Sequence, residues 1–567
     1  MNRKIASFFA LASWVAVAMA QVEYVNPMIG TDGMGHTFPG ACVPFGIVQL
    51  SPDTDTIPHN VDGVYQGKAY EYCAGYQYHD KTIVGFSHTH MSGTGHSDLG
   101  DILIMPTTGP IKLNPDSGYR SRFTHDTEKA APGYYEVKLD DYGVKVQLTA
   151  TQRVGVHKYT FPVDKEGRIV LDLNHSIYNY EGKTLWATLR VENDTLLTGY
   201  RITNGWARTN YTYFAISLSQ PIKNYGYKDH QRILYNGWWR KFPINNNFPE
   251  MAGRKLVSYF EFDTSRNPEL VVKVALSATS TEGALKNLQA EAVSKSFEMI
   301  ASEASDNWKR QLASIEIQGT KDQQVMFYTS YYHTMINPSV YMDVDGKYRG
   351  LDHNIHQAKG FTNYTIFSLW DTYRAEHPLL MLMKPNEATD MVKSMIKHQQ
   401  QSVHGLLPVW SHMANDNWCM SGYHSTSVLT DAITKGADVN KEEALKAMVV
   451  TSNVSYYDGI GDYIKLGYVP FDVNGTAAST TLEYAYDDWT IYKTALNMGY
   501  EEVASQYRIR ALNYHHIFDK EKGWFRPRKA DGTWVEWPEN ARLKEWYGCI
   551  EANSYQQGWF VPHGVPG

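Results

Sequence analysis

The spacing of hydrophobic residues changes near residue 280 and divides the chain into two parts. In the first part, apolar and polar residues alternate, as they do in strands with one buried face. The clearest alternation is carried by Val144, Val146, Leu148 and Ala150. Further runs of β-branched or aromatic residues cover 169–173, 211–218 and 270–276. Short turns such as 140–143 separate these runs, so the first part is predicted to be a β-sandwich.

Beyond residue 280 the apolar period becomes helical. One stripe at helical spacing consists of Val293, Phe297, Ile300, Ala304, Trp308 and Leu312. This stripe predicts one long helix that links the two parts of the chain. Further helices are predicted over 387–401, 441–450, 482–496 and 503–518. The last two are separated by a short turn at Gly499, a typical residue after a helix end, so they predict an antiparallel helical hairpin.

Helical hairpins in series indicate an (α/α)6 barrel, but too few helical segments follow residue 320 to close one. The predicted fold class is therefore multidomain β + α, with an N-terminal β-sandwich followed by an (α/α)6 barrel that is incomplete in this chain. The predicted parts are a signal peptide at 1–20, the sandwich at 21–280, a linker helix at 281–318 and the partial barrel at 319–567.

The first 20 residues have the three features of a secretory signal. Arg3 and Lys4 give a charged start, the apolar run 5–17 follows, and residues 18–20 form an A-x-A cleavage site. No cysteine follows that site, so a lipoprotein anchor is not expected. No later segment has the ~18 consecutive apolar residues of a membrane span. The protein is predicted to be periplasmic or secreted.

Composition narrows the expected partners. The net charge is -7 without a long run of either sign, which argues against nucleic acid as a main partner. Aromatic residues make up 13%, and such rings either stack on sugar rings or fill a large core. No protein partner is predicted. The four cysteines are expected to be buried thiols or to form at most one or two bridges: Cys42, Cys73, Cys419 and Cys549.

Two Gly-rich segments in the first part are candidates for a site. The segment 26–46 either packs the mature N-terminus tightly or lines a site. The segment 85–101 carries His88, His90, His96 and Asp98. Its imidazoles and carboxylates have three possible roles: they bind a metal, they hydrogen-bond a polyhydroxylated ligand, or they fix the loop.

Two segments in the second part carry further candidates. In the segment 368–374, Trp370 is suited to stack on a sugar while Asp371 and Arg374 bond vicinal hydroxyls. The alternative is a tryptophan that anchors a helix start beside an Asp–Arg ion pair. In the segment 547–559, Glu551 lies among aromatic and amide residues, which would raise its pKa and suit a general acid. The alternative is a solvated surface glutamate.

Six segments in this order resemble the landmarks of glycoside hydrolase family 92: VNPMIGTDGMGHTFPGACVPFGIVQLSPD, GFSHTHMSGTGHSDLGDILIMP, SLWDTYRAEHPLL, WCMSGYHS, TLEYAYDDW and CIEANSYQQGWFVPH. The resemblance runs from residue 25 to residue 563. It implies exo-acting, inverting α-mannosidases that use Ca²⁺ and process mannose-containing glycans, N-glycans among them. It also implies a β-sandwich packed on an (α/α)6 barrel.

The resemblance assigns roles to individual residues. The glutamate of the family's C-I-E-G-N motif, the general acid, corresponds to Glu551, and the family's mannose-contacting W-D pair corresponds to Trp370 and Asp371. Substrate contacts are expected from these two residues together with Arg374, His88 and His90. Calcium ligands are expected at Gln556 and Asn553.

Several positions depart from the family pattern. Ala552 replaces a common glycine, Tyr555 and Gln557 flank Gln556 where W-Q-Y is usual, and Gly564 replaces a common aspartate. The family's general-base motif lies downstream of the segment that ends this sequence, so the base is expected beyond residue 567. The chain therefore resembles a C-terminally truncated family member, and little turnover is expected from the 567 residues alone.

Two alternative functions remain. One is a non-catalytic glycan-binding protein, and the other is a different glycosidase or phosphorylase with a β-sandwich and an α/α-barrel. The sequence does not specify the mannosidic linkage, the oligomeric state or the disulfide state.

Overall fold

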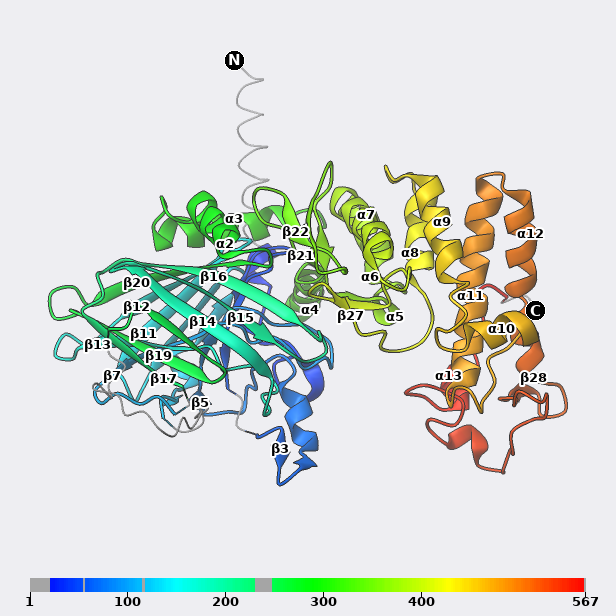
Figure 1. Ribbon diagram of the computed structural model, residues 1–567, viewed down its shortest axis with the longest axis horizontal. Helices are drawn as coiled ribbons and strands as arrows, with labels where there is room; N and C mark the ends of the chain where they lie inside the picture. The colour runs from blue at the N-terminus through cyan, green and yellow to red at the C-terminus, as the bar shows by residue number, and fades with distance from the viewer. Residues whose placement is uncertain (1–20, 55–56, 115–117, 230–246, 565–567) are drawn as a thin grey trace, which may run out of the picture. The chain divides into compact units, whose positions relative to one another are not determined.

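The computed structural model describes residues 21–54, 57–114, 118–229 and 247–564. The predicted signal peptide at 1–20 lies outside these residues. The chain forms two compact units, which divide between Tyr348 and Arg349. Strands predominate in the N-terminal unit and helices in the C-terminal unit (Figure 1). The predicted boundaries at 280 and 318 stay predictions.

The first unit is built on two large antiparallel sheets. The seven-stranded sheet has the order β1 (Ala41–Cys42), β2 (Gln49–Asp53), β6 (Gly85–Ser87), β7 (Leu103–Thr108), β13 (Gly167–Asp172), β19 (Leu256–Phe262) and β17 (Asn224–Asp229). The nine-stranded sheet has the order β18 (Glu250–Gly253), β14 (Thr184–Asn193), β15 (Leu196–Thr203), β16 (Asn210–Leu218), β20 (Glu269–Ser277), β12 (Val154–Thr160), β11 (Val144–Ala150), β10 (Tyr134–Leu139) and β9 (Lys129–Ala131).

The core of this unit lies between the two sheets. Strand β11 sends Val144, Val146 and Leu148 into it, and all three are fully buried. The seven-stranded sheet contributes Ile104 and Ile169 to the same cluster. The predicted strands at 144–150, 169–173, 211–218 and 270–276 are confirmed as β11, β13, β16 and β20. The turn predicted at 140–143 joins β10 to β11, whose end residues Leu139 and Val144 are paired.

Two helices cover the outer face of the nine-stranded sheet: α2 (Thr281–Glu291) and α3 (Phe297–Leu312). Figure 1 shows both above β16 and β20. The prediction of one long helix is wrong, because the chain leaves the helical conformation at Ala292 and Ser296 caps α3 by accepting a hydrogen bond from the Met299 amide. Val293 therefore lies between the helices.

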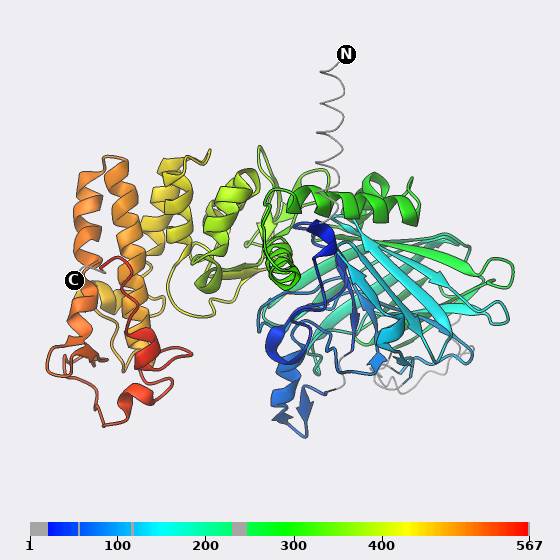
Figure 2. The same cartoon turned by 180° about the vertical axis from the view of Figure 1, so that it is seen from behind.

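The segment 26–46 packs against helix α4 (Lys321–His333) within the first unit (Figure 2). The Asn26 amide donates to the Thr329 hydroxyl at 3.0 Å. The Cys42 thiol lies 3.4 Å from the Tyr332 hydroxyl, and the Trp308 indole donates to the Cys42 carbonyl at 2.7 Å. These contacts give the segment a packing role.

The second unit is mainly helical. Its helices are α5 (Leu369–Thr372), α6 (Glu376–Met383), α7 (Pro385–Gln401), α8 (Ser425–Thr434), α9 (Lys441–Thr451), α10 (Ile460–Leu466), α11 (Ala477–Asn497), α12 (Glu501–Arg510) and α13 (Ser554–Gln557). A small sheet joins β25 (Phe367–Ser368), β26 (Trp410–His412) and β27 (Asn415–Asp416). The order of a β-sandwich followed by a helical unit agrees with the predicted fold class.

The predicted hairpin of helices is confirmed as α11 and α12, which pack side by side. Gly499 follows α11 with a φ of 78°, as expected of a residue that ends a helix in the left-handed conformation. The second helix is shorter than predicted, because α12 ends at Arg510 and a 3-10 turn at Asn513–Ile517 follows.

The remaining described elements are short. They comprise 3-10 turns at Gly33–Gly35, Gly67–Tyr72, His125–Thr127 and Ala541–Leu543, and strands at Asn60–Val61, Val64–Tyr65, Thr82–Ile83, Ser121–Arg122, Ser339–Val340, Lys347–Arg349, Ile355–Gln357, Tyr364–Thr365, Phe518–Asp519 and Trp524–Phe525. The four cysteines, all within the described residues, are free. Among the described helices, none has the length and apolar character needed to cross a membrane.

Candidate active site

Trp370 and Asp371 lie on the one-turn helix α5, directly after strand β25. The Ser368 hydroxyl donates to Asp371 Oδ2 at 2.6 Å and fixes the carboxylate near the start of this turn. The Trp370 ring is half-buried, whereas Asp371 is exposed. A half-buried ring beside an exposed carboxylate suits the binding of a polar ligand with an apolar face.

Arg374 follows one turn later and lies against three aromatic rings. Its guanidinium carbon is 5.2 Å from the Trp370 ring centre, 4.9 Å from that of Tyr373 and 5.1 Å from that of Phe560. Its Nε donates to the Trp370 carbonyl at 3.1 Å. Arg374 therefore supports Trp370 by stacking, which differs from the ion pair with Asp371 that was one of its alternative roles.

Glu551 lies in a loop that is attached to the start of helix α11. The Gly548 carbonyl accepts hydrogen bonds from the amides of Ala478 and Ser479, at 2.9 and 3.0 Å. The Ser479 hydroxyl accepts from the Ile550 amide at 3.0 Å. Glu551 itself has a φ of 46°, a left-handed conformation that costs a residue with a side chain about 1–3 kcal/mol. The surrounding contacts hold it there.

The charge of Asp371 acts on two other carboxyl groups in this region. Glu551 is exposed to solvent, but partial burial raises its pKa above the ordinary value, and the charge of Asp371 raises it further. The same two causes raise the pKa of Glu376, at the start of α6, to about 8. A carboxyl group that keeps its proton at higher pH is suited to donate it, so Glu551 has the electrostatic setting of a general acid.

Asn553 and Gln556 form the capping box of the short helix α13. Asn553 Oδ1 accepts from the Tyr555 and Gln556 amides at 3.0 and 3.2 Å, and Gln556 Oε1 accepts from the Asn553 amide at 2.9 Å. Gln556 Oε1 accepts one hydrogen bond and keeps a second lone pair, whereas Asn553 Oδ1 uses both of its lone pairs in the cap. Both are hard donors of the kind that Ca²⁺ accepts, although neither carries a charge.

A group of buried polar side chains lies beneath Trp370. The Trp370 indole nitrogen donates to Glu483 Oε1 at 3.0 Å, and Gln557 Nε2 lies 3.4 Å from the same oxygen. The Ser421 hydroxyl donates to Glu483 Oε2. Although burial alone would raise it, these contacts and His424 hold the pKa of Glu483 below its ordinary value. These side chains form one network around Glu483.

His424 connects this network to a second acid of helix α11. Its Nδ1 donates to Asp487 Oδ1 at 2.8 Å, its Nε2 lies 3.5 Å from Glu483 Oε2, and its ring stacks on Tyr373. Burial alone would lower the pKa of His424, but the two carboxylates raise it to about 9. Gly422 is required beside it, because a Cβ there would lie 2.5 Å from His424 Nε2.

His88 and His90 lie in the interior of the first unit, and both are fully buried. His88 Nδ1 lies 2.6 Å from the Ile102 carbonyl, and its Nε2 lies 2.9 Å from Nε2 of His157. His90 contacts the Gln49 carbonyl at 2.6 Å and Asp53 at 2.9 Å. Each ring thus uses both nitrogens within the protein, and a substrate contact by these residues stays a prediction.

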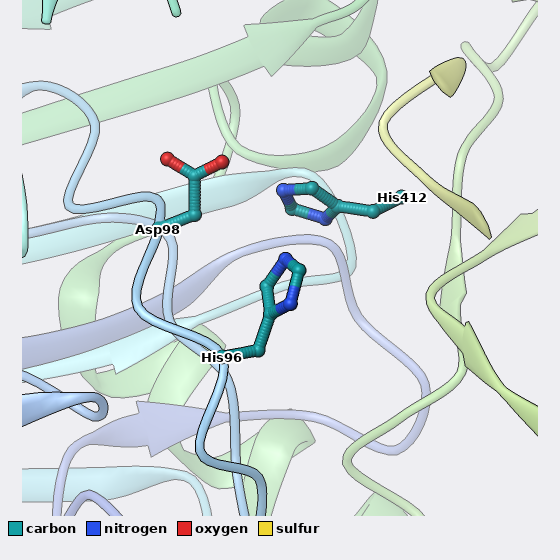
Figure 3. A group of neighbouring side chains, drawn as sticks. All are labelled: His96, Asp98 and His412. Carbon is teal, nitrogen blue, oxygen red and sulfur yellow. The ribbon is translucent and has the colours of Figure 1, made fainter. Parts of the chain in front are cut away.

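Farther along the same loop, His96 and Asp98 are also buried (Figure 3). Asp98 pairs with Lys183 and accepts from the Ala207 amide at 3.2 Å. The His96 ring lies 4.6 Å from the ring of Trp206, centre to centre. These contacts fix the loop, which was one of the roles predicted for it. His412, the third side chain in that figure, belongs to β26 of the second unit.

Two family models match this chain over almost its whole length. A model of the glycosyl hydrolase family 92 N-terminal domain matches residues 24–277, and a model of the family's catalytic domain matches residues 283–567. The chain belongs to glycosyl hydrolase family 92. The resemblance seen in the six sequence segments is therefore confirmed, and the protein is a glycoside hydrolase by family.

Solved structures of other family 92 members have the same fold. An α-mannosidase of the family from Bacteroides thetaiotaomicron, in complex with mannoimidazole, is 38% identical with a TM-score of 0.88, over 96% of this chain and 70% of that one. An inverting mannosidase from B. thetaiotaomicron VPI-5482 is 28% identical with a TM-score of 0.83, over 95% of this chain and 71% of that one.

A third relative is a protein of Arthroderma benhamiae described as an uncharacterised secreted glycosidase. It is 24% identical, over 99% of this chain and 74% of its own length. The expectation that this family 92 chain is truncated is not borne out by these comparisons.

The second unit of this family 92 protein brings together Trp370, Asp371, Arg374 and Glu551, all of which sequence reasoning selected. It did not select Glu483 or His424. A usable signal was the spacing along α11, where Thr480, Glu483, Asp487, Thr490 and Thr494 recur every three or four residues and are all buried. Such a polar stripe on an otherwise apolar helix indicates a buried network.

Proposed function

We propose that this protein removes terminal α-linked mannose from glycans by hydrolysis with inversion, assisted by Ca²⁺. The observation that carries the proposal is that the second unit brings together Glu551, the Trp370 ring stacked by Arg374, and Asp371, whose charge raises the pKa of Glu551. Two relatives whose names specify mannosidases support the sugar, and one of them is named as inverting. The substrate class is a mannose-containing glycan such as an N-glycan.

The proposed roles follow from the chemistry of each side chain. Glu551 protonates the departing glycosidic oxygen as the general acid. Asp371 accepts hydrogen bonds from mannose hydroxyls, the Trp370 ring covers an apolar sugar face, and Arg374 keeps that ring in place. The general base that activates water stays a prediction without an assigned residue.

The amide oxygens of Asn553 and Gln556 fit a role as two of the ligands of a Ca²⁺ ion. Both are hard donors in the segment that follows Glu551. Gln556 Oε1 has a free lone pair for the ion, and Asn553 Oδ1 would exchange one of its two capping hydrogen bonds for it. Calcium takes roughly six to eight oxygen ligands, so sugar hydroxyls, water or carboxylates would complete the shell. When bound, the ion supplies positive charge that orients the hydroxyls of the sugar.

Export to the periplasm or the medium belongs to the same proposal. Its support is the cleavage pattern of residues 1–20 and the description of one relative as a secreted glycosidase. Extracellular glycans would then be the accessible substrates.

The test uses the purified protein with p-nitrophenyl α-mannoside and with α-linked mannobioses. We expect release of mannose, with the β-anomer as the first product in proton NMR spectra recorded before mutarotation. Such turnover by the 567 residues would contradict the sequence-based expectation that the general base lies beyond them. Dialysis against EDTA should abolish turnover, and Ca²⁺ should restore it. Glu551→Gln serves as the inactive control for the mannobioses, whose leaving groups need protonation. Glycan binding without any mannose release would instead indicate a glycan-binding protein, and α-mannose as the first product would contradict inversion.

A further inference from the structure

Glu483 contacts side chains from three separate segments of the second unit. Trp370 and Gln557 share its Oε1, and Ser421 donates to its Oε2. We propose that Glu483 is a positioning residue, which holds the sugar-stacking ring of Trp370 and the segment after Glu551 in one fixed arrangement. The inference rests on the proposed function, because it assigns Glu483 to the same site.

A carboxylate is well suited to this position. The indole N–H of Trp370 can only donate a hydrogen bond, and an ionised carboxylate can only accept. Glu483 is fully buried, so each donor that lost it would be left without a partner in a medium of low dielectric. The two oxygens satisfy donors on opposite sides, which couples the positions of those donors to one another.

The same helix also fixes the loop of Glu551. Glu483 lies about one turn after Ala478 and Ser479, whose amides donate to the Gly548 carbonyl. Gln557 returns to Glu483 from the far side of Glu551. The loop of Glu551 is therefore attached to α11 both before and after the glutamate. A shift of the Glu483 side chain would displace both Trp370 and the loop of Glu551.

Of the other buried acids of α11, Asp487 shares His424 with Glu483, whereas Asp488 has different partners. Asp487 accepts from His424 and from the Tyr423 amide, at 2.8 and 2.7 Å. Asp488 pairs with Arg510 at 2.8 Å. These contacts join α11 to α8 and α12, so they stabilise the helical packing. Asp488 thus provides a control for the loss of a buried charge on the same helix.

The experiment compares Glu483→Gln with Asp488→Asn in protein labelled with 5-fluorotryptophan. The ¹⁹F resonance of Trp370 is assigned by its absence in Trp370→Phe. We expect Glu483→Gln to shift that resonance and to lower kcat/KM for aryl α-mannosides about tenfold or more. Asp488→Asn should lower the thermal midpoint yet leave the Trp370 resonance in place. Ser421→Ala removes one donor and should shift the resonance slightly, which provides a milder variant if Glu483→Gln fails to fold.

A double-mutant cycle separates positioning from general stability. In the Trp370→Phe background, Glu483→Gln should lower kcat/KM by a smaller factor than in the wild-type background, since one of the two elements that it positions is absent. An equal loss in both backgrounds, or an unmoved Trp370 resonance, would overturn the inference. If the wild-type protein hydrolyses no α-mannoside, the proposed function fails, while the resonance still decides whether Glu483 positions Trp370.

Discussion

His157 donates its Nε2 proton to Nε2 of His88, across 2.9 Å, inside the β-sandwich. The direction follows from the two ends of the chain of hydrogen bonds. The Ile102 carbonyl can only accept, so His88 carries its proton on Nδ1 and presents a lone pair at Nε2. His157 then carries its proton on Nε2 and accepts from the Tyr159 hydroxyl, 2.8 Å from its Nδ1. Both rings must be neutral for this series of hydrogen bonds to form.

This pair makes the first unit sensitive to acid. Burial lowers the pKa of His88 to about 3 and that of His157 well below its ordinary value. In the unfolded chain both rings take up a proton near pH ~6.5. Below that pH the unfolded state binds protons that the native state does not bind. The free energy of unfolding therefore decreases as the pH falls below ~6.5, by up to about 1.4 kcal/mol per pH unit for each ring.

Chemical denaturation from pH 7 to pH 4.5 measures this loss. His157→Gln keeps an acceptor and a donor but does not titrate, so its free energy of unfolding should depend less steeply on pH, by about one proton. His515→Gln, at an exposed position, is the matched control and should retain the wild-type slope. Equal slopes in all three proteins would contradict the assigned tautomers.

The sequence was sufficient for the sandwich because each strand carries its own pattern. Val144, Val146 and Leu148 alternate with polar residues whatever their partners are, so the buried face can be read locally. The break between α2 and α3 was missed for the opposite reason. Val293 matches the helical period by coincidence, while the cap at Ser296 ends the helix there.

The polar stripe of α11 could be read locally, but the partners of its buried acids could not. Glu483 and Asp488 resemble a solvated helix face, and they are buried because distant partners satisfy them. Trp370 lies 113 residues from Glu483, and Arg510 lies 22 residues from Asp488. Glu551 could be selected from the family resemblance, but its left-handed conformation and the effect of Asp371 on its pKa required the structure.

His424 makes the second unit sensitive to alkali. Burial alone would lower its pKa, but Asp487 and Glu483 raise it to about 9. The folded state therefore holds this proton more tightly than the unfolded chain does. The resulting stability is fully present below pH ~6.5, declines above it and is lost as the pH rises through about 9.

Unfolding measured between pH 7 and pH 10 should show this decline. His424→Gln should be less stable at pH 7, by about 3–5 kcal/mol, because it leaves buried carboxylates without their cation. It should also lose the alkaline slope, whereas His515→Gln, at an exposed position, should keep it. A wild-type stability that stays constant up to pH 10 would show that His424 is neutral.

Asp371 is expected to affect both binding and the pH profile. Asp371→Ala removes a charged hydrogen-bond acceptor and should cost roughly 3 kcal/mol or more in kcat/KM. Asp371→Asn removes the charge that helps to raise the pKa of Glu551, so the alkaline limb of kcat/KM should move to lower pH.

Ser368→Ala is the control for Asp371. It removes the hydroxyl that donates to Asp371 and retains the carboxylate charge, so the alkaline limb should stay where it is in the wild-type protein. If the alkaline limb of kcat/KM does not move in Asp371→Asn, Asp371 has no effect on the pKa of Glu551. Near-normal kcat/KM in Asp371→Ala would return Trp370 and Asp371 to a structural role.

Glu551→Gln should separate substrates by their leaving groups. The glutamine has the size of the glutamate and cannot donate the proton that a poor leaving group needs. Hydrolysis of α-linked mannobioses should therefore fall by about 10²–10⁴-fold, the usual contribution of general acid catalysis. Dinitrophenyl α-mannoside, whose leaving group departs without protonation, should lose much less, and the alkaline limb of its profile should disappear. Equal losses on both substrates, with unchanged folding and Ca²⁺ response, would show that Glu551 acts as a ligand or as a structural residue. In that case Glu376, whose pKa is raised to about 8 in the same region, is the carboxyl to test next by the same comparison.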